Sequence, residues 1–444
     1  MTKFFYFIFL IFTIPNALAG RGAIVVVDNS TETPVTITST QSDCIDGSIN
    51  QTLASIAATN AYLEATSSGL CFFSTSGSGE FTIKANSIYL GKISYSISAS
   101  NNTQASVIEE ATPNYKLRAY SINTLSRTSG QDIISIRITP PDNGQYKDWM
   151  WQLRTTLKNK RLGDIILPGT HDSLTNDLSS SICDADPDTG FFTSFGKGFA
   201  TAQYLDFTTQ LNRGIRYFDL RLCRQNNTNY IAHGLISNKN FETELNSLKQ
   251  FTANNPYEII VLDLQHIYGY DENSFKNVLD YIKTNFGDQL IRTNEVTLTD
   301  NLATIWGINY GCPLVPHSIL VILPQTDYTN NILADPQYNF AWPRSTISSP
   351  WPQTTDINTM LQKNTATLVS RPYPRLSVNQ LILTPDSSYI TSNLSSSLEY
   401  LALQSLSNVY SWLNSNMRNG LNIYIRDWSN GYDGAIFAIR ANSI

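Results

Sequence analysis

The hydrophobic residues of this chain follow two different patterns, one on each side of residue 140. In the first part, short runs of β-branched residues are separated by segments of Ser, Thr, Asn and Gly. The runs cover residues 23–27, 35–38, 81–84, 93–97 and 133–138. Short strands with polar turns between them are typical of an antiparallel sandwich or barrel. We therefore predict a smaller all-β, sandwich-like domain over residues 20–143.

The second part begins after a Pro/Gly/Asx cluster at residues 139–144, which marks a boundary. Helical spacing of Trp149, Met150, Leu153 and Leu157 predicts a capping helix. Near-continuous apolar runs then recur at 165–167, 215–222, 259–262, 319–323, 366–369 and 421–425. Such strands indicate a parallel sheet covered on both faces, and a closed β/α barrel fits them. We predict an α/β catalytic barrel over residues 144–444, with its chemistry at the C-terminal ends of the strands.

The first 19 residues have the features of a secretory signal peptide. Lys3 precedes an apolar run over residues 4–14, and Ala17-Leu-Ala19 offers a small-x-small cleavage site. The apolar run is too short to span a bilayer. We therefore expect a secreted protein, either extracellular or periplasmic.

Export permits disulfides, and the chain has five cysteines, at positions 44, 71, 183, 223 and 312. The pairs Cys44–Cys71 and Cys183–Cys223 would each lie within one predicted domain. Other pairings stay open at this point, because connectivity cannot be deduced from sequence, and one thiol is left over.

Composition restricts the class of partner. The net charge is −6, only 15% of residues are charged, and no basic run offers a surface for phosphates. Nucleic acid is therefore not expected as a partner. A phospholipid membrane surface would have to be held by aromatic and apolar contacts. The phenylalanines of the segment 179–200 (Phe191, Phe192, Phe195 and Phe199) suit either a membrane-contacting lid or a small core beneath the loop.

Four residues near predicted strand ends suggest phosphodiester chemistry. His171 follows the first apolar strand of the second part, Asp219 and Arg221 end the next, and His233 comes shortly after. Two imidazoles can divide the work of general base and general acid, since their usual pKa lies near 6.5. A planar guanidinium can hold phosphate oxygens, and Asp219 can orient an imidazole or the attacking hydroxyl.

The chain contains four segments in this order: Leu167-Pro-Gly-Thr-His-Asp-Ser173, Gly214-Ile-Arg-Tyr-Phe-Asp-Leu-Arg221, His233-Gly234 and the strand 258–264. Together they resemble the X domain of phosphatidylinositol-specific phospholipases C. The resemblance covers about residues 148–444. It implies a distorted TIM-type barrel and attack on phosphorus by the inositol 2-hydroxyl of the lipid. By this analogy His171 is the general base and His233 the general acid, and the products are diacylglycerol and a cyclic inositol phosphate.

The same resemblance bears on metals. Arg221 stands where the calcium-dependent members carry a calcium ligand, and Asp172 stands where they carry an asparagine. The chain is therefore similar to the secreted bacterial, metal-independent branch, in which a guanidinium replaces the cation electrostatically. Asp427 resembles the late aspartate that orients the base histidine. We accordingly expect neither a metal nor another cofactor.

Head-group recognition departs from the family pattern. Simple bacterial members carry a lysine after the third strand, where this chain has Asp263, Gln265 and His266. We expect Asp263 and Gln265 to contact an inositol phospholipid substrate. Arg371 and Tyr373, placed after the predicted strand 366–369, suit polar and stacking contacts, or are simply a loop pair.

Two other functions remain open from the residues alone. One is a phosphodiesterase for another phospholipid head group, although such barrels usually need a Glu-x-Asp metal site and this chain has Asp219-Leu-Arg221. The other is an inactive barrel that serves as a lipid- or glycan-binding adhesin, against which the retention of both histidines argues.

Overall fold

The computed structural model of the chain describes residues 21–66, 71, 74, 76–98, 102–124, 131–187, 190, 196–308, 315–393 and 396–444. The predicted signal peptide over residues 1–19, Phe191, Phe192, Phe195 and Cys312 lie outside these residues. Within the described part of the chain, none of the helices combines the length and the apolar character needed to cross a bilayer.

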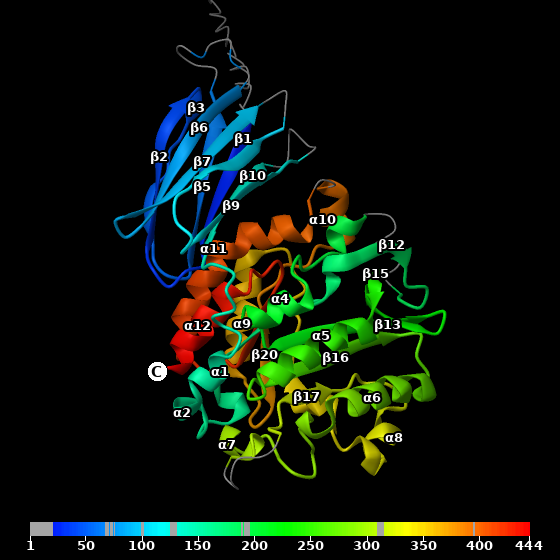
Figure 1. Cartoon of the computed structure of the whole chain (residues 1–444). Helices are drawn as coiled ribbons and strands as arrows, with labels where there is room; N and C mark the ends of the chain where they lie inside the picture. Colours follow the sequence, from blue (N-terminus) through cyan, green and yellow to red (C-terminus); the bar gives the residue numbers. More distant parts are fainter. Residues whose placement is uncertain are drawn as a thin grey trace, which may run out of the picture.

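The N-terminal part forms two five-stranded sheets among the described residues, packed face to face (Figure 1). One sheet has the order β3-β5-β1-β10-β9 and the other β4-β2-β6-β7-β8. The strands are β1 (Gly22–Asn29), β2 (Val35–Asp43), β3 (Ile45–Asp46), β4 (Asn50–Leu53), β5 (Ala57–Ala65), β6 (Ser76–Ala85), β7 (Ile88–Ser98), β8 (Gln104–Glu110), β9 (Lys116–Ile122) and β10 (Asp132–Thr139). Neighbouring strands are antiparallel except β1 and β10, which pair in parallel. The expectation of short strands in this region is confirmed.

Strands β1 and β10 are buried on both faces, which explains their near-continuous apolar sequence. Val25 and Ile134 face the other sheet in the sandwich core, which also contains Ile37 and Phe81. Val26, on the opposite face of β1, packs in the core of the C-terminal part. The sandwich is therefore joined to the rest of the molecule through the outer face of the sheet that contains β1, β5 and β10, and β5 packs directly against α11.

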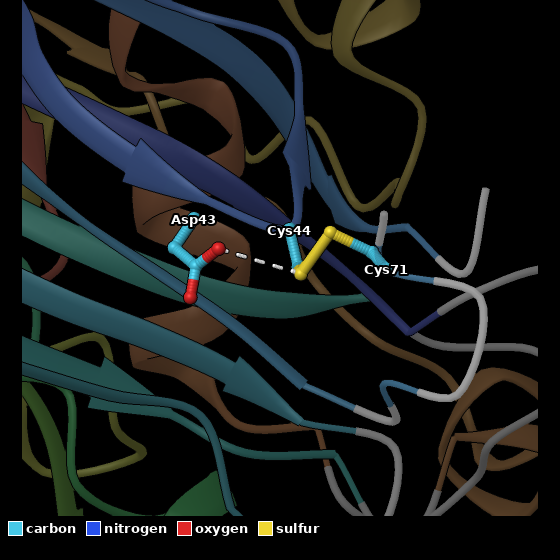
Figure 2. Close-up of side chains that lie close together, drawn as sticks. All are labelled: Asp43, Cys44 and Cys71. Carbon is cyan, nitrogen blue, oxygen red and sulfur yellow. Dashed lines mark hydrogen bonds between the residues drawn. A yellow bond between two sulfur atoms is a disulfide. The ribbon is translucent and has the colours of Figure 1, made fainter. Parts of the chain in front are cut away.

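Both cysteine pairs considered from the sequence are disulfides in the structure. Cys44 is bonded to Cys71 at the edge of the sandwich, beside Asp43 (Figure 2). Cys183 is bonded to Cys223 in the C-terminal part.

The C-terminal part is built on parallel strands with helices around them (Figure 1). In the described residues eight strands pair in parallel in the order β18-β17-β16-β13-β11-β21-β20-β19. They are β11 (Leu167–Thr170), β13 (Tyr217–Gln225), β16 (Ile260–Tyr268), β17 (Ile319–Ile322), β18 (Ala341–Trp342), β19 (Ile347–Ser348), β20 (Leu376–Gln380) and β21 (Ile423–Arg426). The predicted α/β architecture is confirmed. The ring is not closed, because no hydrogen-bonded pairing joins the two-residue strands β18 and β19 among the described residues.

An antiparallel extension grows from β13 and carries one of the two site histidines. It consists of β14 (Thr228–His233), β15 (Leu235–Asn240) and β12 (Leu178–Ile182). The Cys183–Cys223 disulfide ties the residue after β12 to β13. His233 is thereby brought back over the end of the parallel sheet.

The helices cover the parallel strands and make the contact with the sandwich. They are α1 (Trp149–Gln152), α2 (Arg154–Leu157), α4 (Phe207–Asn212), α5 (Phe241–Asn254), α6 (Glu272–Phe286), α7 (Leu302–Ile305), α8 (Thr329–Ala334), α9 (Ile357–Val369), α10 (Ser387–Ser392), α11 (Leu398–Asn416) and α12 (Tyr432–Asn442). Short 3-10 turns lie at Leu162–Asp164, Thr175–Asp177, Lys197–Phe199, Gly287–Gln289, Pro336–Tyr338 and Arg344–Thr346. Helix α11 runs between the sandwich and the parallel strands (Figure 1).

One predicted strand is wrong. Residues 366–369 are the last turn of α9, which Asp356 caps by accepting a hydrogen bond from the Thr359 amide. Met360, Asn364 and Leu368 are its buried residues, at helical spacing. A short apolar run fits a buried strand and one turn of a helix equally well, and the sequence pattern does not separate them.

Candidate active site

His171 and Asp427 are brought together by the register of two neighbouring strands. Strands β11 and β21 are parallel, with Thr170 opposite Arg426, so the residues that follow both emerge at the same edge. His171 Nδ1 lies 2.8 Å from Asp427 Oδ1. Because a carboxylate can only accept, Nδ1 is the protonated nitrogen and Nε2 faces the site. Both residues are at least nine-tenths buried.

The residues that follow His171 and Asp427 share an uncommon backbone conformation. Asp172 has φ 43° and Trp428 has φ 51°. The left-handed region is tolerated by aspartate and strained for a large aromatic residue. Strain of this kind is held in place by surrounding contacts and is often found at functional sites.

Arg221 lies between the two carboxylates Asp172 and Asp219. Its Nε forms an ion pair with Asp172, and its Nη2 is 3.9 Å from Asp219 Oδ2. Nη2 also lies 3.1 Å from His171 Nε2. Arg221 and Asp219 lie on β13, which pairs with β11. Side chains of β13 therefore come close to His171, which follows β11.

His233 completes the cluster from the other side. Its Nδ1 is 2.8 Å from the Ala200 carbonyl oxygen and 3.4 Å from Asp172 Oδ2. The carbonyl accepts, so Nδ1 carries the proton and Nε2 is the reactive nitrogen. Asp172 thus lies between the two imidazoles, since its Oδ2 is also 3.5 Å from His171 Nε2.

The charges of the cluster shift the pKa of each histidine differently. Burial lowers the pKa of His171, but Asp172 and Asp427 outweigh it and raise that pKa to about 9. Burial lowers the pKa of His233, and there Asp172 does not compensate. At neutral pH the free protein therefore holds the proton on His171. The contact with Arg221 opposes protonation of His171, because Arg221 Nη2 can donate to His171 Nε2 only when the imidazole is neutral and Nε2 keeps its lone pair.

The pKa values of the two carboxylates Asp172 and Asp219 are shifted in opposite directions. Burial raises the pKa of Asp219, whereas Arg221 and the two histidines lower the pKa of Asp172 against the effect of burial. Asp219 accepts a hydrogen bond from the Asp172 amide at 3.2 Å. With its amide nitrogen turned toward Asp219, Gln265 donates a second bond at 2.8 Å.

Asp263 is part of a neighbouring buried group. It lies beside Asp219 in the register of β13 and β16, and it accepts from the Tyr217 hydroxyl at 2.5 Å. The other carboxylate oxygen of Asp263 forms an ion pair with Arg344, which lies on the 3-10 turn after β18. Sequence reasoning missed Arg344, because the two-residue strand before it has no recognisable pattern. His266, one position past Gln265, lies at the exposed rim with its ring parallel to Tyr268.

The structure does not bring Arg371 and Tyr373 to this site. They precede β20, so they lie at the N-terminal ends of the strands, opposite the histidines. Arg371 there donates to the carbonyls of Gly420 and Gly163, and Arg161 donates to the Tyr373 hydroxyl. Their expected place beside the substrate depended on the strand at 366–369, which is a helix. His317 lies at the same end, before β17, as its position in the sequence predicts.

The residues do not fit the calcium ion that the calcium-dependent branch would need. His171, Asp172 and Asp219 are close enough to share an ion. However, the guanidinium of Arg221 already occupies the space between the two carboxylates. Calcium also needs six to eight oxygen ligands, and one of these three residues offers nitrogen. A second group, Asp43 with Cys44 and Cys71, offers no thiolate, because the two sulfur atoms are bonded to each other (Figure 2).

Parts of this chain are similar to known proteins. Residues 196–308 match the family described as phosphatidylinositol-specific phospholipase C, X domain. PI-PLC X domain-containing protein 2 of Homo sapiens is 31% identical over 262 residues, covering 54% of this chain and 77% of that protein. PI-PLC X domain-containing protein 3 of Danio rerio is 28% identical over 306 residues, covering 64% and 89%. Among solved structures, phosphatidylinositol-specific phospholipase C from Listeria monocytogenes has a TM-score of 0.47 and 18% identity, covering 66% of this chain and 98% of that one.

Proposed function

The chain belongs to the phosphatidylinositol-specific phospholipase C X-domain family, and on that premise we propose that it is a phosphodiesterase that cleaves the glycerol–phosphate bond of phosphatidylinositol-type lipids. One observation carries the proposal. Two histidines flank a single carboxylate, Asp172, and a guanidinium lies against the same carboxylate. This arrangement provides a base, an acid and an anion-binding group within one buried cluster.

In the proposed reaction, the inositol 2-hydroxyl attacks phosphorus and the glycerol oxygen leaves. His171 Nε2 takes the proton of the hydroxyl, while the Nδ1 contact to Asp427 stabilises the imidazolium that forms. His233 gives a proton to the departing diacylglycerol alkoxide. Arg221 stabilises the negative charge on the phosphoryl oxygens. The products are diacylglycerol and a cyclic inositol phosphate.

The charge states of the free protein are the reverse of those with which this reaction begins. His171 holds the proton and the pKa of His233 is lowered. A bound phosphodiester places a negative charge beside His233 and so favours its protonated form. The reactive form is a minor one in the free protein, and kcat/KM should show a bell-shaped pH profile whose basic limb near pH 9 reports His171.

Phosphorus NMR of the products tests the proposed reaction. Purified protein incubated with phosphatidylinositol vesicles should produce a cyclic phosphodiester signal. A substrate with a leaving group of low pKa then separates the two histidines, because it does not need an acid. That substrate should restore turnover to His233→Ala and not to His171→Ala. The absence of a cyclic product from the wild-type protein would contradict the proposal.

We also propose that turnover needs no metal. The proposal is supported by the position of the Arg221 guanidinium between Asp172 and Asp219. A chelator should leave the rate of cyclic phosphate formation unchanged, and added calcium should not raise it. Loss of turnover with chelator, restored by calcium, would overturn this part of the proposal.

The finer description of the chain is likewise proposed. Residues 1–19 would direct export, residues 20–143 would be an accessory β domain, and residues 144–444 would be a catalytic domain of the distorted TIM-barrel type. The two disulfides support an oxidising compartment. N-terminal sequencing of the protein recovered outside the producing cell should begin at residue 20.

A further inference from the structure

A buried ion pair lies where the sandwich meets the α/β part. Asp28 on β1 and Arg137 on β10 are directly opposite each other in the parallel pairing of these strands. Arg137 Nε donates to Asp28 Oδ2 at 3.0 Å, and both residues are at most 3% exposed. A buried charge pair adds little net stability, because the cost of desolvating both charges offsets their attraction.

Asp28 anchors the loop that carries the base-orienting aspartate. Asn430, three residues after Asp427, donates to Asp28 Oδ2 at 3.1 Å and to the Ser30 hydroxyl at 2.7 Å. Tyr410 on α11 donates to Asp28 Oδ1 at 3.1 Å. The far end of the Asp427 loop is therefore bound to a side chain of the sandwich.

Arg137 reaches the same loop by another route. Its Nη1 donates to the Tyr204 hydroxyl at 2.6 Å. The Tyr204 ring stacks on Trp428, with 5.3 Å between ring centroids and 16° between planes. Trp428 is the strained residue next to Asp427, so this stack supports the turn that aims the aspartate at His171.

The five residues 200–204, which we name the connector, touch both site histidines. The Ala200 carbonyl binds His233 Nδ1, and the Ala202 carbonyl accepts from the Trp428 amide at 2.8 Å. Gln203 Nε2 donates at 2.9 Å to the carbonyl of His171 and at 2.9 Å to that of Arg426. Tyr204, the last residue, is the one that Arg137 binds.

We propose that Asp28 and Arg137 of the sandwich are positioning residues for both histidines, so that the active site is complete only when the sandwich is docked. Asp28 acts through Asn430 on the Asp427 loop, and Arg137 acts through Tyr204 on the connector. The inference goes beyond an accessory role for the β domain. It rests on the proposed phosphodiesterase function for its turnover readout, and a second readout does not depend on that function.

Two variants and a matched control test this role. Arg137→Lys keeps the charge opposite Asp28, but one ammonium cannot reproduce the fork that binds both Asp28 and Tyr204. Tyr204→Phe removes only the hydroxyl and keeps the ring on Trp428. Arg21→Lys is the control, because Arg21 and Asp132 form the equivalent pair, at 2.7 Å, at the opposite end of β1 and β10.

We expect Arg137→Lys and Tyr204→Phe to lower kcat by about tenfold to a hundredfold, as a misplacement of about 1 Å does. KM for a soluble inositol phosphodiester should stay within about twofold, since the phosphate contacts are untouched. The control should match the wild type. Thermal unfolding verifies that each variant is folded. If Arg137→Lys does not fold, Tyr204→Phe alone decides whether the sandwich positions the histidines.

Histidine NMR titration gives the independent readout. The pKa of His171 in the wild type should lie near 9, and in both variants it should move toward its ordinary value as Asp427 shifts. Arg21→Lys should titrate as the wild type does. Unchanged kcat together with an unchanged His171 titration in the two variants would overturn the inference. If the wild-type protein turns over no phosphatidylinositol, the function fails, and the NMR titration still decides the positioning role.

Discussion

The two ends of the parallel sheet each hold an arginine of the β13 segment with carboxylate partners, and the two arginines differ in how completely these partners satisfy them. Arg216, directly before the strand, pairs with Glu258 at 2.6 Å, and both side chains are fully buried. Arg216 also donates to the carbonyls of Leu211, Ile215 and Lys147. Glu258 accepts from the amides of Met150 and Trp151 at the start of α1. This end is a closed network.

Arg221, within the same strand, is arranged differently. Its side chain is 17% exposed and is shared among three partners. Nε pairs with Asp172, while Nη2 lies 3.9 Å from Asp219 Oδ2 and 3.1 Å from His171 Nε2. Its carboxylate partners also serve other residues, since Asp172 faces both histidines and Asp219 accepts from Gln265. The comparison shows that one segment supports both a fully satisfied ion pair and an incompletely satisfied one, and the second is the group to which we assign the phosphate in the proposed function. The following predictions separate the two ends.

The largest effect should follow from removing a histidine at the Arg221 end. His171→Gln should lower kcat by about 10²- to 10⁴-fold, the usual worth of a positioned general base. His317→Gln is the matched control, because His317 lies before β17 at the opposite end, paired with Glu295 at 3.5 Å. Initial rates with phosphatidylinositol vesicles check the pair. Equal rates for the two variants would mean that the two ends do not differ in function.

Breaking the closed network should affect stability and not the chemistry. Arg216→Met leaves the Glu258 carboxylate buried without its partner, which costs about 3–5 kcal/mol of unfolding free energy. Lys276→Met, which breaks the half-exposed surface pair with Glu272 at 2.7 Å, should leave the denaturation midpoint nearly unchanged. Urea unfolding measures both variants. The folded fraction of Arg216→Met should keep its specific activity, and a selective loss of kcat there would contradict this division of roles.

Arg221→Lys tests the guanidinium itself. A single ammonium cannot face Asp172, Asp219 and a phosphoryl oxygen together, so kcat should fall by about 10²- to 10³-fold, as when one oxyanion-binding donor is removed. Arg224→Lys, three residues further along β13, is the control, because Arg224 donates to the exposed Asn227. The chelator experiment should be repeated on Arg221→Lys. Calcium-dependent turnover in that variant alone would show that the guanidinium takes the place of a cation.

Among the described residues, an exposed aromatic side chain can be compared at each of the two ends. Trp351 follows β19 at the end that carries the two histidines, is 53% exposed and donates to the Thr384 hydroxyl at 2.8 Å. Tyr373 precedes β20 at the other end and is 60% exposed. Trp351→Ala should weaken binding to phosphatidylinositol vesicles by about threefold to tenfold, which is the loss of one interfacial aromatic contact. Tyr373→Ala should bind vesicles as the wild type does, which a sedimentation assay measures.

Whether a residue of this site can be predicted from the sequence depends on the kind of segment on which it lies. His171, Asp219, Arg221 and Asp427 lie in or directly after apolar strands, and the parallel order of those strands brings them together. His233 ends a hairpin strand close behind Arg221. These placements follow from patterns of burial, which the sequence records.

The rest of the site depends on segments without such a pattern. Gln203 lies on an irregular connector, and Arg344 follows a two-residue strand, so neither has a periodicity that would indicate it. The sequence pattern places Arg371 and Tyr373 at the wrong end of the sheet, because the run 366–369 satisfies strand and helix patterns equally. The open junction between β18 and β19 has the same origin, since two-residue strands form through tertiary contacts.

The smallest effect concerns stability as a function of pH, and it again separates the two ends. The pKa of His171 is about 9 in the folded protein and should be near 6.5 when unfolded. Protonated His171 therefore stabilises the fold fully below pH 6.5, and this contribution is lost as pH rises through 9. For a chain of this size, the melting temperature should fall by about one to three degrees between pH 6.5 and 9.5 through this group. His171→Gln should lack that part of the decrease, while His317→Gln should keep it. Identical decreases in both variants would mean that the carboxylates around His171 do not hold a proton on it.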